Sequence, residues 1–212
     1  MPSGRLVLAT RNADKLVEIR GILGLRDGEL KSLLDFPEFA EIEETGSTLE
    51  ENALIKAVEG FRMTATPCIA DDTGLEVDSL NGAPGVYSSR YAGENATYAD
   101  NVRKLLAVMK DVPPEKRSAR FRCVAALKAE GREEWVEGTC EGVILTERRG
   151  TGGFGYDPVF FVPEIGKTMA EMSPGEKNAI SHRGRAFRKM AEALKRNPIE
   201  TYALRKGLSK KF

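Results

Sequence analysis

Two adjacent carboxylates, Asp71 and Asp72, follow a short apolar run at residues 68–70. The apolar run predicts a buried strand, and the Thr73-Gly74 pair after the aspartates is typical of a turn. Two charges at the end of a buried strand are costly unless a cation or a metal ion pairs with them. Because ligands of open α/β sheets bind beyond the carboxyl ends of strands, the aspartates are candidate site residues.

The rest of the chain mixes strand-like and helix-like segments irregularly, which favours an α/β protein with a mixed sheet. Residues 5–9 predict a buried strand, and Leu16, Ile19 and Leu23 recur at helical spacing over residues 14–23. Further expected elements, in chain order, are a helix over 49–63, a half-buried strand pattern at 75–78, a helix over 97–109, a hairpin over 121–145, a glycine-rich loop over 149–157, a strand over 159–162, a helix start at Ser173 and a last helix after residue 183. The helix over 49–63 has two alternative capping boxes, Ser47 with Glu50 or Thr48 with Glu51.

Composition excludes several classes of protein. Hydrophobic residues are 41% and charged residues 30% of the 212-residue chain, which predicts a soluble globular protein. Basic and acidic residues balance at 32 each, so a dedicated nucleic-acid binder is not expected, although a local basic pocket stays open. There is no apolar run of about 18 residues, so we expect no membrane partner. The three cysteines lack metal-ligand spacing and predict reduced thiols in a cytoplasmic protein; a contact between Cys123 and Cys140 across the hairpin is an alternative.

Acidic side chains gather at three places, namely Glu18, Glu43-Glu44 and Asp71-Asp72. Carboxylate oxygens suit Mg²⁺, which keeps several waters and bridges to substrate phosphates. For any one of these acids alone, a solvated surface charge or a helix cap is an alternative interpretation.

Basic residues near expected turns, above all Lys15 and Lys56, are candidate phosphate ligands. A lysine in the first turn of a helix opposes the helix dipole, so Lys15 is explained if it meets a phosphate. Lys56 lies toward the apolar side of its helix. The alternative for each is an exposed ammonium on a stem that covers apolar surface.

Residues 152–157 place two aromatic rings among glycines. A strand-end loop of this kind allows close approach of a ligand, and the ring of Phe154 offers a face on which a base can stack. The alternative is a hairpin loop whose aromatic residue anchors it to the core. His182, the single histidine, is either a ligand contact or a structural hydrogen-bonding residue.

Five motifs in order resemble the inosine triphosphate pyrophosphatase family over nearly the whole chain, from Leu6 to about Leu194. One departure is Arg11, where the family often has Gly; it is tolerated if this position acts through its backbone, or it adds a cation near the phosphates. The motifs are ATRNADKLVEI (9–19), EETGSTLEENALIKA (43–57), ADDTGLEVDSLNGAPGVYSSRYAG (70–93), GTGGFGYDPVFF (150–161) and EKNAISHRGRA (176–186).

The resemblance implies an α/β fold in which a long mixed sheet and flanking helices form two lobes around a central cleft. It implies one domain over residues 1–196 and usually a homodimer; the tail over residues 197–212 is mildly basic. The implied activity is the Mg²⁺-dependent hydrolysis of ITP, dITP and XTP to the monophosphate and pyrophosphate, which removes deaminated purines from the nucleotide pool.

Carried over residue by residue, the resemblance implies that Asp72 accepts a proton and holds the metal ion with Glu43. Asp71 and Glu18 are expected to be supporting acids. The expected substrate-binding residues are Thr10, Arg11, Asn12, Ala13, Asp14, Lys15 and Lys56 around the triphosphate, and Thr73, Phe154, Gly155, Tyr156, Asp157, Lys177, His182 and Arg183 elsewhere.

Two other functions stay open at this level. One is a pyrophosphatase for other altered nucleotides, such as modified pyrimidines. The other is a nucleotide- or RNA-binding module without catalysis. Three acids near phosphates at residues 43, 71 and 72 argue against a pure anion binder, because they would repel the ligand unless a metal ion bridged them.

Overall fold

The computed structural model describes residues 6–26 and 28–199. These residues form two compact units. Unit 1 comprises residues 6–72, 124–137 and 186–199, and unit 2 comprises residues 73–123 and 138–185. Most of the predicted basic tail, from residue 200 onward, lies outside the described residues, and the predictions of a single domain and a central cleft stay predictions.

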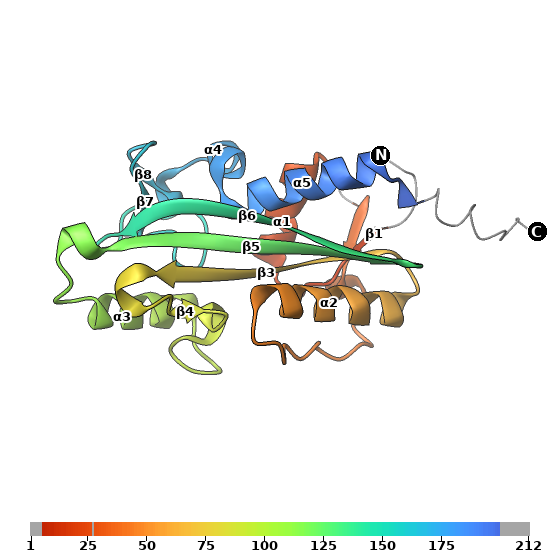
Figure 1. Cartoon of the computed structure of the whole chain (residues 1–212), viewed down its shortest axis with the longest axis horizontal. Coiled ribbons are helices and arrows are strands. Elements are labelled where there is room, and N and C mark those ends of the chain that lie inside the picture. The colour runs from red at the N-terminus through yellow and green to blue at the C-terminus, as the bar shows by residue number, and fades with distance from the viewer. Residues whose placement is uncertain (1–5, 27, 200–212) are drawn as a thin grey trace, which may run out of the picture. The chain divides into compact units, whose positions relative to one another are not determined.

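The described residues form a mixed eight-stranded sheet in the order β2-β1-β3-β5-β6-β7-β8, with β4 paired to β3 (Figure 1). β1 is parallel to β2 and β3, whereas β4, β7 and β8 are each antiparallel to the strand beside them. The strands are β1 (Leu6–Leu8), β2 (Leu30–Ser32), β3 (Cys68–Val77), β4 (Pro84–Gly85), β5 (Ser118–Ala129), β6 (Arg132–Ile144), β7 (Phe160–Val162) and β8 (Lys167–Thr168). The α-helices are α1 (Ala13–Leu23), α2 (Leu49–Thr64), α3 (Tyr98–Val108), α4 (Pro174–Ile180) and α5 (His182–Arg196).

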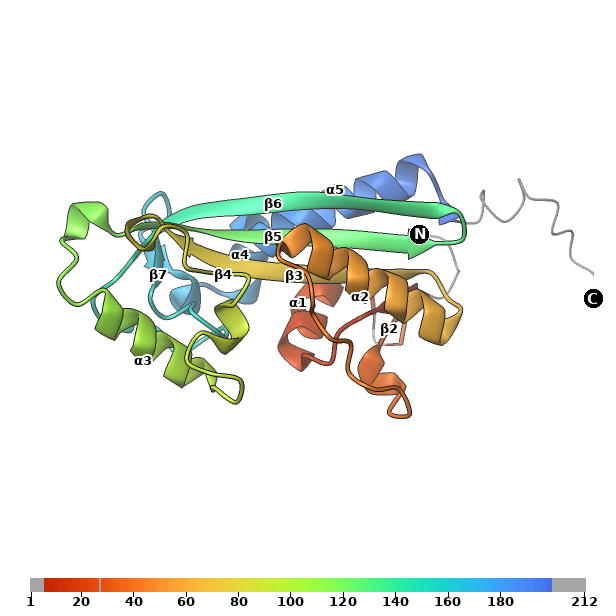
Figure 2. The same ribbon diagram turned by 60° about the horizontal axis from the view of Figure 1, so that its bottom comes forward.

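The helices of unit 1 begin and end where local sequence favours it. Asn12 caps α1, and Gly24 ends it in the left-handed conformation that glycine adopts without strain. Thr48 and Glu51 form the capping box of α2, which decides between the two expected boxes. Within unit 1, α2 covers one face of the sheet and α5 covers the other (Figures 1 and 2).

Unit 2 has its own apolar core. The buried face of α3, with Val102 and Leu105, joins a cluster that includes Phe121 and Phe160. Thr97 caps α3 with Asp100. Burial of these side chains stabilises the unit by roughly 1.5–3 kcal/mol for each large apolar group. The predicted amphipathic helix over 97–109 is therefore confirmed.

One sequence-based expectation is wrong: the buried strand does not end before the two aspartates. β3 continues from Cys68 through Asp71 and Asp72 to Val77. The Thr73-Gly74 pair lies within the strand, where neighbouring strands supply the backbone partners that a turn would otherwise supply. The carboxylates therefore stand on the faces of a strand and not beyond its end.

Other expectations are confirmed. The helices over 14–23 and 49–63 and the hairpin over 121–145 are α1, α2 and β5–β6. The three cysteines are buried thiols and not disulfides. Within residues 6–26 and 28–199, no helix has the length and apolar character needed to cross a membrane.

Candidate active site

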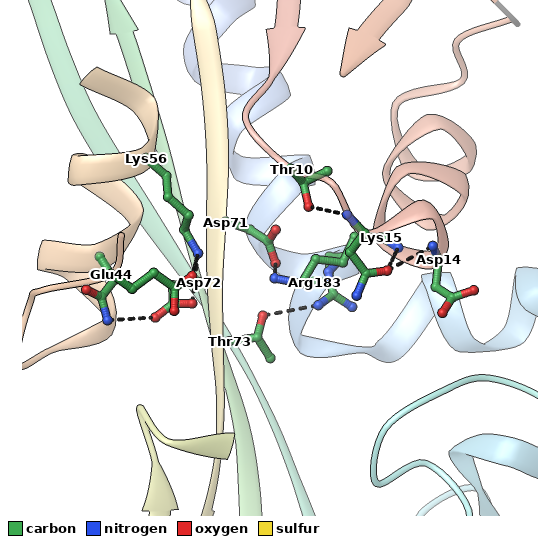
Figure 3. Close-up of polar contacts among 11 residues, drawn as sticks. Thr10, Asp14, Lys15, Glu44, Lys56, Asp71, Asp72, Thr73 and Arg183 are labelled. Carbon is green, nitrogen blue, oxygen red and sulfur yellow. Dashed lines mark hydrogen bonds and ion pairs between the residues drawn. The ribbon is translucent and has the colours of Figure 1, made fainter. Parts of the chain in front are cut away.

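The turn between β1 and α1 is held by its own side chains. The Thr10 hydroxyl accepts a hydrogen bond from the Asn12 amide at 3.1 Å. The Asn12 side chain in turn accepts from the amides of Asp14 and Lys15 at 2.9 and 3.1 Å (Figure 3). The amides of Asn12, Asp14 and Lys15 therefore already have acceptors within the turn. Ala13 and Asp14 are exposed on the same turn.

Lys15 forms an ion pair with Asp71 across unit 1. Its ammonium lies 3.1 Å from a carboxylate oxygen of Asp71, whose side chain is fully buried. A buried carboxylate requires such a partner, because an unpaired charge costs several kcal/mol there. The pair also explains a lysine in the first turn of α1, where the helix dipole alone disfavours a cation.

Lys56 joins two acids on the other side of β3. Its ammonium lies 2.6 Å from Glu44 and 3.0 Å from Asp72. The two aspartates point to opposite sides of the strand (Figure 3), as alternate side chains of a strand do. Each aspartate therefore has its own lysine from its own helix, and the like charges are separated.

Asn52 completes the surroundings of Asp72. Its side-chain nitrogen lies 3.4 Å from an Asp72 oxygen, and its side-chain oxygen accepts from the Gly46 amide at 2.8 Å. Asn52 is fully buried one helical turn before Lys56. It thereby links the end of the acidic segment to the Asp72 carboxylate.

Electrostatics set Asp72 apart from an ordinary carboxylate. Burial raises its pKa, Lys56 acts in the opposite direction, and the charge of Glu44 raises the pKa further. Burial tends to lower the pKa of Lys56, but Asp72, Glu44 and Asp71 together outweigh it and raise the pKa to about 12. Lys56 thus stays protonated at neutral pH, and Asp72 is a stronger base than a solvated aspartate.

In unit 2, the glycine-rich loop is fixed by an ion pair. Lys177 from α4 lies 2.5 Å from Asp157, and both side chains are buried. The same Asp157 oxygen accepts from the Phe154 amide at 2.8 Å. Gly155 has a φ of 62°, a conformation that favours glycine. The loop therefore holds the ring of Phe154 in one place.

Two cations lie beside that ring. The Lys177 ammonium is 4.8 Å and the Arg183 guanidinium 5.5 Å from the centre of the Phe154 ring. Tyr98, the first residue of α3, packs against the ring with 5.8 Å between centroids. Such contacts orient an aromatic ring, and each cation contributes roughly 0.5–2 kcal/mol.

Of the remaining predicted residues of unit 2, Tyr156, His182 and Arg183 are buried and Thr73 is half-buried. Arg183 donates to the Thr73 hydroxyl at 3.2 Å (Figure 3). His182 stacks on Phe121 with 4.5 Å between ring centroids. Tyr156 donates its hydroxyl to the Ser88 carbonyl at 2.9 Å, which ties the loop to the turn after β4. Tyr156 therefore acts as a support for the loop.

The structure brings most predicted residues into two clusters but leaves two acids aside. Lys15, Lys56, Asp71 and Asp72 gather in unit 1. Glu43 is exposed, whereas its neighbour Glu44 meets Lys56. Glu18 is half-buried on α1. The metal-binding role of Glu43 and the supporting role of Glu18 stay predictions.

A family model described as the Ham1 family matches residues 6–193. The chain belongs to the Ham1 family. It is 53% identical over 188 residues to the dITP/XTP pyrophosphatase of Geobacillus kaustophilus, which covers 88% of this chain and 92% of that protein. It is also 53% identical over 197 residues to the dITP/XTP pyrophosphatase of Geobacter sulfurreducens, covering 92% and 99%.

Solved structures of Ham1 proteins have the same fold. A HAM1 protein from Coxiella burnetii matches with a TM-score of 0.81 and 45% identity, covering 91% of this chain and 98% of that one. A nucleoside-triphosphatase, or dITP/XTP pyrophosphatase, from Mycobacterium abscessus matches with a TM-score of 0.70 and 46% identity, covering 88% and 98%. These matches confirm the α/β fold with a central mixed sheet and flanking helices.

The donor set of this Ham1-family chain suits Mg²⁺. Among residues 6–26 and 28–199, no three His, Cys, Asp or Glu side chains gather as a metal-binding group. Mg²⁺ needs only one or two protein carboxylates, since waters and substrate phosphates complete its octahedron. Glu44 and Asp72 already converge on one ammonium, so their oxygens lie where a cation is favourable.

Sequence reasoning named Glu44 only as part of an acidic cluster and missed Asn52. The segment between residues 40 and 46 lies outside helices and strands, so no periodicity shows which of its acids turns inward. Asn52 did carry a signal. It is a polar residue on the buried face of α2, four positions before Lys56, and such a residue requires a hydrogen-bond partner.

Proposed function

We propose that the chain hydrolyses ITP, dITP and XTP to the nucleoside monophosphate and pyrophosphate. The observation that carries this proposal is the Lys56–Asp72 pair, in which a buried carboxylate of raised pKa lies beside cations able to bind phosphate. The names of the relatives, dITP/XTP pyrophosphatases at 53% identity, support the substrate class. The reaction would be an attack of water on the α-phosphorus.

Residues of unit 1 would bind and activate the triphosphate end of the substrate. Lys15 and Lys56 would contact phosphate oxygens and stabilise the charge that develops on the leaving pyrophosphate. Asp72 would accept the proton of the attacking water, for which its raised pKa suits it. The bond between the α-phosphorus and the bridging oxygen would break, and the bridging oxygen would leave with pyrophosphate.

Mg²⁺ is part of the proposal. Asp72 with Glu44 or Glu43 would hold the ion, which when bound supplies positive charge and polarises the phosphoryl group. Within unit 1, Lys15 and Lys56 bring two positive charges, and Glu44, Asp71 and Asp72 bring three negative ones. A divalent cation would offset this excess before an anionic substrate adds to it.

Residues of unit 2 would select the base. Phe154 would stack on the purine, and Arg183 with His182 would donate hydrogen bonds to the 6-keto oxygen of hypoxanthine or xanthine. Adenine has an amino group at that position, so the donors would be left without partners at a cost of about 1–3 kcal/mol. ATP should therefore react about 5- to 150-fold more slowly than ITP.

A product assay in ¹⁸O-labelled water tests the proposal. Pyrophosphate and labelled inosine monophosphate are expected from ITP, because attack at the α-phosphorus places the label there. Label in pyrophosphate, or release of orthophosphate, would contradict the assignment. Rates on ITP, dITP, XTP, GTP and ATP test the base contacts, and equal rates would refute them. If a modified pyrimidine triphosphate is hydrolysed fastest, the alternative of a pyrophosphatase for other altered nucleotides is favoured.

A homodimer and a cytoplasmic location complete the proposal. Both come from the resemblance of the motifs, and three buried thiols are consistent with a reducing compartment. The proposal includes neither a nucleic-acid nor a membrane partner.

A further inference from the structure

Arg11 joins the turn after β1 to a second segment of unit 1. Its guanidinium donates to the carbonyl oxygen of Phe36 at 3.4 Å and also to that of Phe39. One residue earlier, the carbonyl of Thr10 accepts from the Leu33 amide at 3.2 Å. The turn is therefore tied to residues 33–39 at two places, and the Arg11 side chain is directed at carbonyl oxygens.

Residues 33–39 fold as a compact block, so hydrogen bonds from Arg11 to one part of it can fix the position of the whole block. Ser32 and Asp35 cap the short 3-10 helix at its start by reciprocal hydrogen bonds. The Phe39 amide donates to the Phe36 carbonyl at 3.2 Å, and the two rings stack with 5.9 Å between centroids. The carbonyls to which Arg11 donates therefore belong to a folded turn.

The acidic segment over residues 40–46 begins where this block ends. It lies outside helices and strands and carries Glu43 and Glu44. Its far end is fixed by the Gly46 amide, which donates to Asn52 at 2.8 Å. Its near end begins one residue after Phe39, whose carbonyl Arg11 holds. The acidic segment is therefore held at its start by Arg11, through Phe39, and at its end by Asn52, through Gly46.

We infer that Arg11 is a positioning residue that orders the acidic segment and so keeps Glu44 at Lys56. Both carbonyls accept from the same nitrogen, Nη2, whose two N–H groups have fixed directions in the planar guanidinium, whereas the ammonium of a lysine turns freely on a flexible stem. The alternative is that Arg11 is a phosphate ligand, for which the positive charge alone is needed. The effect of Arg11 on segment order is independent of the proposed reaction, but its effect on metal binding rests on the proposed function.

Hydrogen–deuterium exchange of the nucleotide-free protein tests this inference. In Arg11→Met, peptides covering residues 37–46 should exchange about tenfold faster, since two hydrogen bonds from a charged donor are lost. Peptides of α3 should not change. Arg26→Met is the matched control, because Arg26 is largely exposed and forms a local ion pair with Glu29; it should leave residues 37–46 unchanged.

Arg11→Lys distinguishes positioning from phosphate binding and remains informative if Arg11→Met does not fold. Faster exchange over residues 37–46 is expected for the lysine variant as well. Unchanged exchange in both variants would overturn the inference. Full rescue by lysine of both exchange and turnover would also overturn it, because charge alone would then suffice.

Steady-state kinetics give a second readout. The Mg²⁺ concentration for half-maximal pyrophosphate release should rise about tenfold in Arg11→Met, as it does when a residue supporting a metal ligand is lost. The KM for ITP at saturating Mg²⁺ should stay within about twofold, whereas a lost phosphate contact would raise it about tenfold. If the unmodified protein releases no pyrophosphate, the proposed function fails, and the exchange result still decides the role of Arg11 in segment order.

Discussion

Asp71 and Asp72 are adjacent in sequence but have different surroundings. Asp71 is paired with Lys15 on α1, and Asp72 is paired with Lys56 on α2. A strand separates them because successive side chains point to opposite faces. The roles can therefore differ: Asp71 compensates the charge of a lysine, while Asp72 combines a raised pKa with a second acid nearby.

After burial, Glu44 should contribute to the raised pKa of Asp72. Its negative charge raises that pKa, so Glu44→Gln should lower it, and the loss of a competitor should also strengthen the pull of Lys56 on Asp72. Carbon-13 NMR titration of the metal-free protein would measure the shift. Glu43→Gln is the matched control, because Glu43 is exposed. A rise in the Asp72 pKa in Glu44→Gln, or an equal drop in both variants, would contradict the geometry.

The buried Lys177–Asp157 pair should be costly to break from one side. Lys177→Met leaves the Asp157 carboxylate buried without its cation, although the Phe154 amide still donates to it. The free energy of unfolding should fall by about 3 kcal/mol, as measured by urea denaturation. The double variant Lys177→Met/Asp157→Asn should recover part of the loss. No recovery would show that packing, and not charge, carries the effect.

At the scale of elements, α2 packs closely on the strands of unit 1. A Cβ atom at Gly60 would lie 2.5 Å from the Cys68 sulfur and 3.0 Å from the Ala9 side chain. Glycine at this position therefore sets the distance between helix and sheet. The same packing brings Asn52 and Lys56 to Asp72.

Gly60→Ala should destabilise the protein despite the higher helix propensity of alanine. Overpacking typically costs about 1–3 kcal/mol, against a gain of about 1 kcal/mol from propensity. Gly175→Ala in α4 is the matched control, since its Cβ would meet nothing within 4 Å. The thermal unfolding midpoints of both variants are compared with that of the unmodified protein. A Gly60→Ala midpoint equal to or above that of the unmodified protein would contradict the packing.

Most helices and strands were predictable from the sequence, and the course of β3 was the exception. Apolar spacing identified α1 and α3, a capping box marked the start of α2, and alternation identified the β5–β6 hairpin. The passage of β3 through Thr73-Gly74 was not predictable from local patterns, because it depends on hydrogen bonds from neighbouring strands. The contact of Glu44 with Lys56 was hidden as well, since residues 40–46 lie outside helices and strands and carry no periodicity.

At the scale of the whole molecule, the family resemblance supplied what periodicity did not. No local pattern relates the turn at Thr10 to Asp72, which lies on another strand far along the chain. The motifs named both, and the structure of unit 1 brings Lys15 to the neighbouring Asp71. Residues that support the site, such as Tyr98 against the ring of Phe154, lie outside the family motifs and become evident only from the fold.

We predict a homodimer in solution. Size-exclusion chromatography with light scattering should give twice the chain mass of 23.3 kDa. The measurement is best made at several protein concentrations, because a weak dimer dissociates on dilution. A mass of one chain at every concentration would contradict this prediction without affecting the proposed chemistry.

The most direct test of the proposed function is pyrophosphate release from ITP by Asp72→Asn. Loss of the base should lower turnover by about 10²–10⁴-fold. Circular dichroism and the thermal unfolding midpoint should show that the fold is retained, because asparagine keeps the shape of the side chain and its contact with Asn52. Turnover close to that of the unmodified protein would contradict the assignment of Asp72 as the proton acceptor.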